Sequence, residues 1–271
     1  MDNGNARDDK REIAESGAPL DVEAVRAGIV GLRLGQPFLY FPAIDSTNTY
    51  AVQLAREGAT DGTLVTTDDQ TAGRGRIGRG WRSLPGQQLA VSLVLRPGFS
   101  PHFLVMASAL AVAETIEVVA ELAADVKWPN DVQVGVRKVC GILIETSADF
   151  AVLGIGLNVN GSLAADAELA ARATTLAEAA SRPLAREALL IALLTRLDAL
   201  YAHLSAGGMA AQGDLRRRWR ARLVTLGRRV VLLQGEQTVA GMAEDVDADG
   251  ALLLRRDDGT LLPVTWGDVH S

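Results

Sequence analysis

The sequence predicts an α+β fold in two parts, a main domain with a mixed or antiparallel sheet and a small β-barrel-like domain after it. Two observations carry this prediction. Before Gly227, short apolar runs typical of strands are interspersed with a few segments of helical periodicity. After Gly227, the chain contains short strand-like runs separated by the turn signals Gln234-Gly235, Asp249-Gly250 and Asp258-Gly259.

The first half of the main domain mixes strands with short helices. Asp21 is a suitable N-cap for the first helix, and Gly58 is a suitable stop for the second. The expected elements are a helix over 22–31, a strand at Phe38–Ile44, a helix over Asn48–Glu57, and strands at Thr63–Thr67 and Leu89–Leu95.

The second half of the main domain opens on the clearest helix of the chain, over 103–124. Its apolar stripe runs through Leu104, Ala107, Leu110 and Ala111. The elements expected after it are strands at Val126–Trp128, Val132–Val136, Val139–Glu145 and Phe150–Ile155, and helices over Leu163–Ala180, Leu184–Leu204 and 209–223.

We divide the 271 residues into a disordered N-terminal tail over 1–20, a main domain over 21–224 and a C-terminal domain over 225–271. The tail is polar and aperiodic, so it lacks the apolar residues that would anchor it. The strands expected in the C-terminal domain are Val230–Leu233, Thr238–Val246, Leu252–Arg255 and Leu261–Val264.

Composition and charge exclude several classes of protein. Hydrophobic content of 48% is ordinary for a soluble domain, and no apolar run approaches the roughly 20 residues of a membrane span. Met1–Lys10 has no apolar signal region and Cys140 is the single cysteine, which together indicate a cytoplasmic protein. The net charge of −6 argues against a general nucleic-acid binder. The scattered His102, His203 and His270 form no ligand cluster, so no metal bound directly by protein ligands is expected.

The run Gly73–Trp81, called the Gly/Arg loop below, is the most informative segment, because glycines alternate with arginines and an indole closes it. Glycine lets a backbone approach a ligand closely, and the arginine fork matches phosphate and carboxylate oxygens. The run is no P-loop, because no Gly-Lys-Ser/Thr ending follows, and no dinucleotide fingerprint, because a turn and a strand follow it. We interpret it as a loop that closes over an anion, in preference to an exposed basic turn.

A second segment, Lys127–Asp131, lies where a strand ends in a turn. Its lysine either meets an anion in a pocket or is a surface lysine beside an ordinary turn, and taken alone the segment favours the second interpretation. Asn130 and Asp131 are candidates for binding Mg²⁺ through water. The run Arg216–Arg220 is interpreted first as a solvated helix face.

Further candidates lie on a strand edge and at a helix start. Gly154 and Gly156 alternate along one strand and Gly141 lies on a neighbouring one, which leaves room for a flat ligand or marks a β-bulge. Asp45–Asn48 is either a helix cap alone or a cap that also binds a polar ligand head.

Taken in order, these segments resemble the biotin protein ligase family. The resemblance extends from Phe38 to the C-terminus, and its most specific parts are the Gly/Arg loop and Lys127–Asp131. It implies a class II synthetase-like catalytic domain with a mixed sheet, followed by a small SH3-like barrel. The segments that carry it are Ser46–Asn48, Gln70–Trp81, Lys127–Asp131, Lys138–Glu145 and Gly154–Asn158.

The resemblance also implies a reaction. The carboxylate of biotin attacks the α-phosphate of ATP, which gives biotinyl-5′-AMP and pyrophosphate. A lysine of a biotin carboxyl carrier protein domain then attacks the adenylate and becomes biotinylated. Two anions must meet in the first step, so positive charge is needed to reduce their repulsion.

By this resemblance, Lys127, Arg74 and Arg76 are the catalytic residues, and Lys127 contacts both the biotin carboxylate and the reacting phosphate. Mg²⁺ is expected to accompany ATP. The residues expected to bind biotin are Ser46, Thr47, Asn48, Gln70, Arg74, Gly75, Arg76, Lys127, Gly141, Gly154 and Gly156, with the last three leaving space for the bicyclic ring. Those expected to bind ATP or the adenylate are Arg74, Arg76, Arg79, Trp81, Lys127, Asn130 and Asn158.

The sequence departs from the family pattern in two places. Some members carry an N-terminal winged helix-turn-helix and repress transcription, but the residues before Phe38 lack two helices at turn spacing. We therefore expect a monofunctional ligase that binds no DNA. Gln88 stands where the pattern has Asn. A homodimer through exposed edge strands is left open.

Two rival interpretations remain at this point. A lipoate–protein ligase or octanoyltransferase shares the fold, although the Gly/Arg loop and Lys127–Asp131 argue against it. A non-enzymatic nucleotide-sensing or nucleic-acid-binding module would rest on the arginines of the loop and of Arg216–Arg220.

Overall fold

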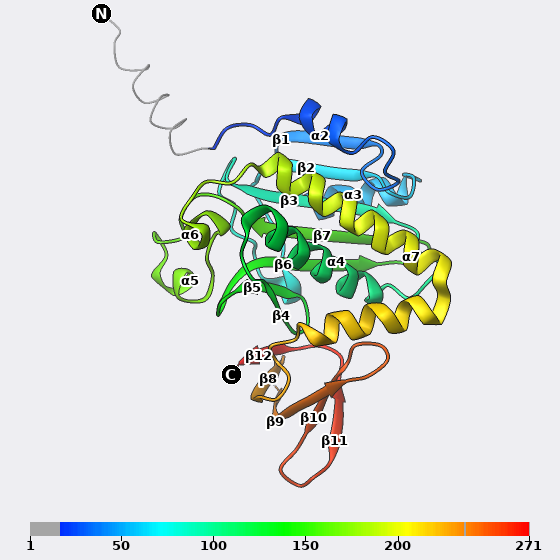
Figure 1. Cartoon of the computed structure of the whole chain (residues 1–271), viewed down its shortest axis with the longest axis vertical. Helices are drawn as coiled ribbons and strands as arrows, with labels where there is room; N and C mark the ends of the chain where they lie inside the picture. Colours follow the sequence, from blue (N-terminus) through cyan, green and yellow to red (C-terminus); the bar gives the residue numbers. More distant parts are fainter. Residues whose placement is uncertain (1–16, 236, 271) are drawn as a thin grey trace, which may run out of the picture.

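The computed structural model describes residues 17–235 and 237–270, and a seven-stranded sheet lies at the centre of the main domain (Figure 1). Its strand order is β1-β2-β3-β7-β6-β5-β4, with β1 and β2 parallel and the other neighbours antiparallel. The prediction of an α+β fold with a mixed sheet is confirmed. The strands are β1 (Phe38–Ile44), β2 (Leu64–Gln70), β3 (Gln88–Leu95), β4 (Asp125–Lys127), β5 (Asp131–Val134), β6 (Arg137–Thr146) and β7 (Ala151–Asn158).

Helices cover both faces of this sheet. The helices α4 and α7 pack together on one face (Figure 1), and α3 covers the other. Strand β3 is therefore buried at every position, which explains its unbroken apolar run. The helices are α2 (Val22–Gly28), α3 (Thr47–Arg56), α4 (His102–Thr115) continued by the π-turn η2 (Ile116–Ala120), α5 (Ala167–Arg172), α6 (Leu176–Ala180) and α7 (Arg186–Ala221), with the 3₁₀ turn η1 (Arg76–Gly78) in the Gly/Arg loop.

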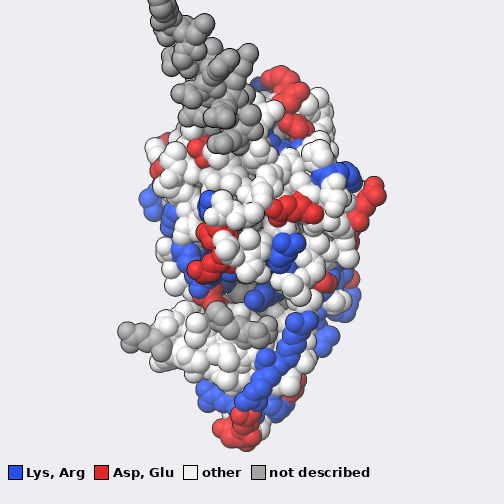
Figure 2. Space-filling view, turned by 90° about the vertical axis from the view of Figure 1, so that its left-hand side faces the viewer, with Lys and Arg blue, Asp and Glu red and all other residues white. Residues whose placement is uncertain are grey.

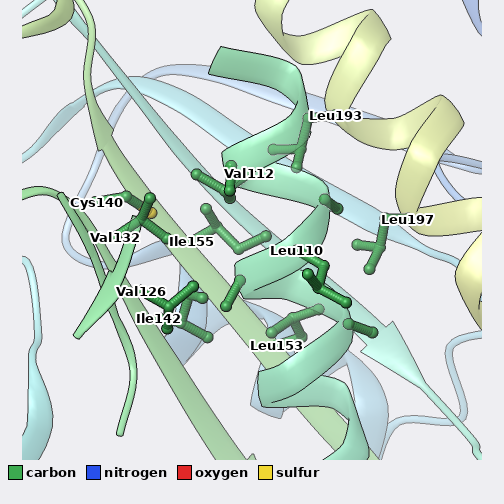
Figure 3. Close-up of a cluster of buried hydrophobic side chains, with 14 of the residues drawn as sticks. Leu110, Val112, Val126, Val132, Cys140, Ile142, Leu153, Ile155, Leu193 and Leu197 are labelled. Atoms are coloured by element: carbon green, nitrogen blue, oxygen red, sulfur yellow. The ribbon is translucent and has the colours of Figure 1, made fainter. Parts of the chain in front are cut away.

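The main core lies between α4, α7 and the inner strands, as Figure 3 shows. In this view Val112 of α4 lies on the side of the strands, whereas Leu110 lies on the side of α7, from which Leu193 and Leu197 extend toward α4. Cys140 belongs to this core, and burial raises the pKa of its thiol. Its role as buried filler, expected from the apolar run around it, agrees with this position.

One helical prediction differs from the structure, and another is confirmed by a kink. The helix expected over Leu163–Ala180 is two short helices, because Thr174 donates its N–H to the carbonyl of Lys138 at 2.9 Å and so leaves the helical path. Thr175 then starts α6 with a capping box that includes Glu178. The helices expected over Leu184–Leu204 and 209–223 are confirmed as the two segments of α7, which meet at a kink at Gly208, where φ is +52°.

Two helices of the described chain, η2-extended α4 and α7, are long and apolar enough to cross a membrane by length and composition alone. A long helix was expected over 103–124, but the sequence analysis found no apolar run long enough for a membrane span. In α4 the apolar stretch is 72% buried within the protein, which is the position of a central core helix. Its hydrophobicity is thus accounted for by packing against the sheet and α7.

The N-terminal end of the described chain is packed against the main domain. Of the tail predicted over 1–20, residues 1–16 lie outside the described residues, whereas Leu20 is buried and Gly17 donates to the carbonyl of Pro85 at 3.0 Å. Asp21 caps α2 as expected, accepting from the N–H of Ala24.

The C-terminal domain is a five-stranded antiparallel sheet with the order β11-β10-β9-β8-β12. The strand β12 was not predicted. Basic side chains gather over the lower part of the molecule in Figure 2. Within the C-terminal domain, Arg229 is paired with Asp257 and Arg255 with Glu244. The strands are β8 (Arg229–Gln234), β9 (Gln237–Val246), β10 (Leu252–Arg255), β11 (Leu261–Val264) and β12 (Asp268–His270).

Trp128 joins the two domains. Its indole N–H donates to the carbonyl of Gly250 at 3.0 Å, and its backbone N–H donates to Thr225 Oγ1 at 3.0 Å. The side chain is 2% exposed, so the bond to Gly250 lies in a place that water does not reach. Gly250 also has φ +85° and a methyl group of Met106 against it, so the turn has no space for a side chain.

We predict that Trp128→Phe lowers the free energy of unfolding by about 1–2 kcal/mol, because it leaves the Gly250 carbonyl buried without a donor. The measurement is urea unfolding at neutral pH. Trp266→Phe is the control, since Trp266 is 44% exposed and should change stability little. Equal losses in the two variants would contradict the role given to Trp128.

Candidate active site

A cavity of about 130 Å³ lies between the Gly/Arg loop and the sheet. The residues around it come from the start of α3, from the loop, and from β2, β3, β5, β6, β7 and β12. Most of the predicted site residues are brought together here. Those that line the cavity are Ser46, Thr47, Asn48, Gln70, Arg74, Gly75, Arg76, Arg79, Trp81, Asn130, Gly141, Gly154 and Gly156.

One end of the cavity is a connected set of polar side chains at the start of α3. Gln70 Oε1 accepts from the backbone N–H of Thr47 at 2.9 Å and from its hydroxyl at 3.1 Å. Asn48 donates to Glu145 Oε2 at 3.0 Å. Ser46 caps the helix by accepting from the N–H of Thr49 at 3.4 Å. The cap interpretation is confirmed, and the same residues also face the cavity.

Ser92 is a member of this polar set that the sequence analysis did not name. Its hydroxyl oxygen lies 2.6 Å from Asn48 Oδ1 and 2.8 Å from Thr47 Oγ1, and the residue is fully buried. A single hydroxyl in the middle of the apolar run Leu89–Leu95 was the available signal, because a buried polar group needs a partner.

Glycines form the floor of the cavity. Gly141 on β6 lies opposite Gly156 on β7, and the pairing from Cys140 to Thr146 is regular, so these strands have no bulge at the glycines. A Cβ at Gly156 would lie 2.7 Å from the ring of Trp81, and one at Gly154 would lie 2.1 Å from Asn48 Oδ1. The indole of Trp81 therefore lies on the glycine floor that was expected to hold a flat ligand.

The cations of the cavity are each held by an acceptor. Arg74 pairs with Glu145 at 3.0 Å, and Arg76 donates to Asn130 Oδ1 at 2.6 Å. Burial lowers the pKa of Arg76, which the nearby carboxylates partly offset. Arg79 is paired with Asp268 of β12, so the C-terminal domain supplies part of the cavity wall.

The lysine that reaches the cavity is Lys138. Its Nζ lies 2.7 Å from Asp131 Oδ1 and 5.8 Å from the centre of the Trp81 ring. Lys127, which was expected in this place, lies on the edge strand β4 opposite Asp131 and outside the cavity lining.

A β-bulge explains this position of Lys138. Val132 pairs with Cys140, but the next residue, Gln133, pairs with Lys138, so Val139 is one extra residue on β6. The bulge lets both Val139 and Cys140 enter the core. It also turns Lys138 toward the same side as Gly141, which a regular strand would not do.

Asn158 lies outside the cavity lining and joins three parts of the main domain. Its Oδ1 accepts from Gln88 Nε2 at 3.0 Å, and its Nδ2 donates to the carbonyl of Thr174 at 3.1 Å. Gln88 Oε1 in turn accepts from the N–H of Leu84 at 3.2 Å. Gln88 therefore connects the chain after the Gly/Arg loop to β7.

The oxygen-bearing side chains of the cavity are candidates for binding a metal ion. Within the described residues, no group of three or more histidine, cysteine or acidic side chains is placed to hold a metal ion. The side-chain oxygens of Asp131 and Asn130 face the cavity, where they accept hydrogen bonds from Lys138 and Arg76 respectively.

Comparison with known proteins identifies the family. The model of the Biotin/lipoate A/B protein ligase family matches residues 40–160, and that of the Biotin protein ligase C terminal domain matches residues 225–270. A biotin–[acetyl-CoA-carboxylase] ligase of Mycobacterium tuberculosis is 35% identical, over 93% of this chain and 95% of the relative. The bifunctional ligase/repressor BirA of Bacillus subtilis is 32% identical, over 89% of this chain and 76% of that protein.

A solved structure agrees with these matches. The biotin protein ligase from Aquifex aeolicus, in complex with biotin and ATP, has a TM-score of 0.76 and 29% identity, covering 86% of this chain and 97% of that one. The fold and the similarity over most of the chain both indicate the same family. The chain belongs to the biotin protein ligase family.

Proposed function

We propose that this protein activates biotin with ATP to biotinyl-5′-AMP and transfers the biotinyl group to a lysine of a biotin carboxyl carrier protein domain. The observation that carries the proposal is the cavity itself, in which Lys138 and the arginines of the Gly/Arg loop surround a floor of glycines. The family membership supports the same activity.

In the first step, a carboxylate oxygen of biotin forms a bond to the α-phosphorus, and the bond to pyrophosphate breaks. Both reactants are anions, so the barrier falls when fixed cations lie between them. Lys138 and Arg74 line the place where these groups would meet. We therefore assign to Lys138 the contacts that the sequence analysis gave to Lys127.

The polar end of the cavity suits the ureido ring of biotin. That ring offers both donors and acceptors, and Thr47, Asn48 and Gln70 provide both kinds of group. Binding of the bicyclic ring on the glycine floor requires the indole of Trp81 to leave Gly156, so movement of the Gly/Arg loop accompanies binding.

In the second step, the amine of the carrier lysine attacks the carbonyl carbon of the adenylate, and AMP leaves with the electrons of the acyl–oxygen bond. The amine loses a proton in forming the amide. Closure of the Gly/Arg loop would keep water from the mixed anhydride until the carrier arrives.

Mg²⁺ accompanies the phosphates of ATP in this proposal, where it neutralises part of their charge. Asp131 and Asn130 line the cavity and carry the oxygen atoms that Mg²⁺ prefers, so the residues fit a hydrated ion held mainly by phosphate. We also propose that the protein acts in the cytoplasm and binds no operator DNA, and that exposed edge strands could support a homodimer.

The lipoate ligase alternative is not favoured. One family model covers both activities, but the relatives that match along most of the chain are biotin ligases.

We predict that Lys138→Ala reduces biotin-dependent exchange of labelled pyrophosphate into ATP by about a hundredfold or more, because a fixed charge between the two anions is lost. Lys127→Ala is the matched control and should retain most of the exchange. Loss in the Lys127 variant with retention in the Lys138 variant would overturn the assignment. Exchange that requires lipoate or octanoate instead of biotin would overturn the proposed substrate.

We also predict that biotin with ATP slows tryptic cleavage of the Gly/Arg loop about tenfold or more at saturation, since cleavage follows the population of the open loop. Arg74 and Arg79 are each at least half exposed, so trypsin can reach them in the free protein. Limited proteolysis followed by mass spectrometry locates the cuts. Equal rates with and without the substrates would contradict closure of the loop.

A further inference from the structure

Residues 17–20, called the strap below, cross the chain at the point where it leaves the Gly/Arg loop. Gly17 donates to the carbonyl of Pro85 at 3.0 Å, and Gly86 donates to the carbonyl of Asp68 at 3.0 Å. A Cβ at Gly17 would lie 2.0 Å from the Gly86 oxygen, and one at Gly86 would lie 2.4 Å from the Gly17 oxygen. The two backbones are thus in direct contact, and neither position has room for a side chain.

Arg186 connects the strap to the sheet. Its guanidinium donates to the carbonyl of Ala18 at 2.6 Å, to Asp68 Oδ1 at 2.7 Å and to the carbonyl of Gln88 at 3.1 Å. The side chain is 5% exposed, so these bonds are made away from water. One buried cation at the start of α7 therefore joins the strap, the end of β2 and the start of β3.

Asp68 accepts hydrogen bonds from several of the groups that hold the strap. Besides Arg186, it accepts from the N–H of Leu20, at 3.3 Å, and from the hydroxyl of Tyr40. Burial, with this bond to Asp68, raises the pKa of the Tyr40 hydroxyl to about 12, so the hydroxyl remains a donor at neutral pH. All the groups that approach Asp68 are donors, and its carboxylate keeps them in place.

The strap fixes both ends of the connection that contains the Gly/Arg loop. Asp68 lies two residues before Gln70, which lines the cavity, and Gln88 holds the N–H of Leu84 at 3.2 Å. Gly17, Asp68 and Arg186 lie outside the cavity lining, so any effect they have on the reaction is indirect.

We propose that the strap, held by Arg186 and Asp68, is a positioning element that presets the Gly/Arg loop for closure over the adenylate. This inference rests on the proposed function. A loop whose two ends are fixed loses less conformational freedom on closing, so the adenylate is retained longer.

The test compares Gly17→Ala with Gly98→Ala, a glycine with open space around it. Gly17→Ala is expected to speed release of biotinyl-5′-AMP and raise KM for biotin by between about tenfold and a hundredfold, with little change in melting temperature. Gly98→Ala is expected to match the wild type. Release and KM unchanged in a folded Gly17→Ala protein would overturn the proposal.

A deletion pair covers the case in which Gly17→Ala fails to fold. Removal of residues 1–16 leaves the strap, whereas removal of 1–19 takes away the contacts of Gly17 and Ala18. The longer deletion is expected to increase tryptic cleavage in the Gly/Arg loop without any substrate present, and the shorter one is not. Equal cleavage in both would overturn the proposal. Because this readout needs no activity, loss of biotin-dependent exchange in the wild type would count against the proposed function alone.

Discussion

Repulsion between like charges is the constraint on which this site depends. Several cations face one cavity, and without counter-charges they would push the Gly/Arg loop open. Each of the carboxylates that hold them comes from a different strand, so both sheets must be assembled before the cavity exists. These pairs are partly exposed, so each is worth no more than about 1 kcal/mol. A phosphate or carboxylate ligand can therefore replace them at little cost. The pairs are Arg74 with Glu145, Lys138 with Asp131, and Arg79 with Asp268.

The sheet supplies the second requirement, which is a flat surface under those charges. Gly141 and Gly156 are direct partners across β6 and β7, so the side-chain positions above them are empty of protein Cβ atoms. The indole of Trp81 lies against this surface. Strand pairing and loop position are thus linked, because the same surface serves the closing residue and the ligand.

Much of the fold follows from local signals in the sequence, but the identity of the cavity lysine does not. Apolar runs and Gly-containing turns located most strands, since each signal acts within a few residues. The strand β12 was missed because it is three residues long. The capping box of Thr175 was a visible signal for two helices where one was predicted. Lys138 was given no role in the site because its direction depends on a bulge at Val139, and a bulge is set by pairing with β5 rather than by the residue itself.

The backbone at the tip of the Gly/Arg loop, which lies between the two domains, is strained. Ile77 has φ +54°, a conformation that disfavours a β-branched residue by roughly 1–2 kcal/mol. On one side of it Arg76 donates to Asn130 and to the carbonyl of Gly267, and beyond it Arg79 is paired with Asp268. These contacts, from the main sheet and from the C-terminal domain, hold the two arginines and so impose the strained turn between them. The C-terminal domain is in this way part of the candidate site, because its last strand and the turn before it contact the arginines of the loop.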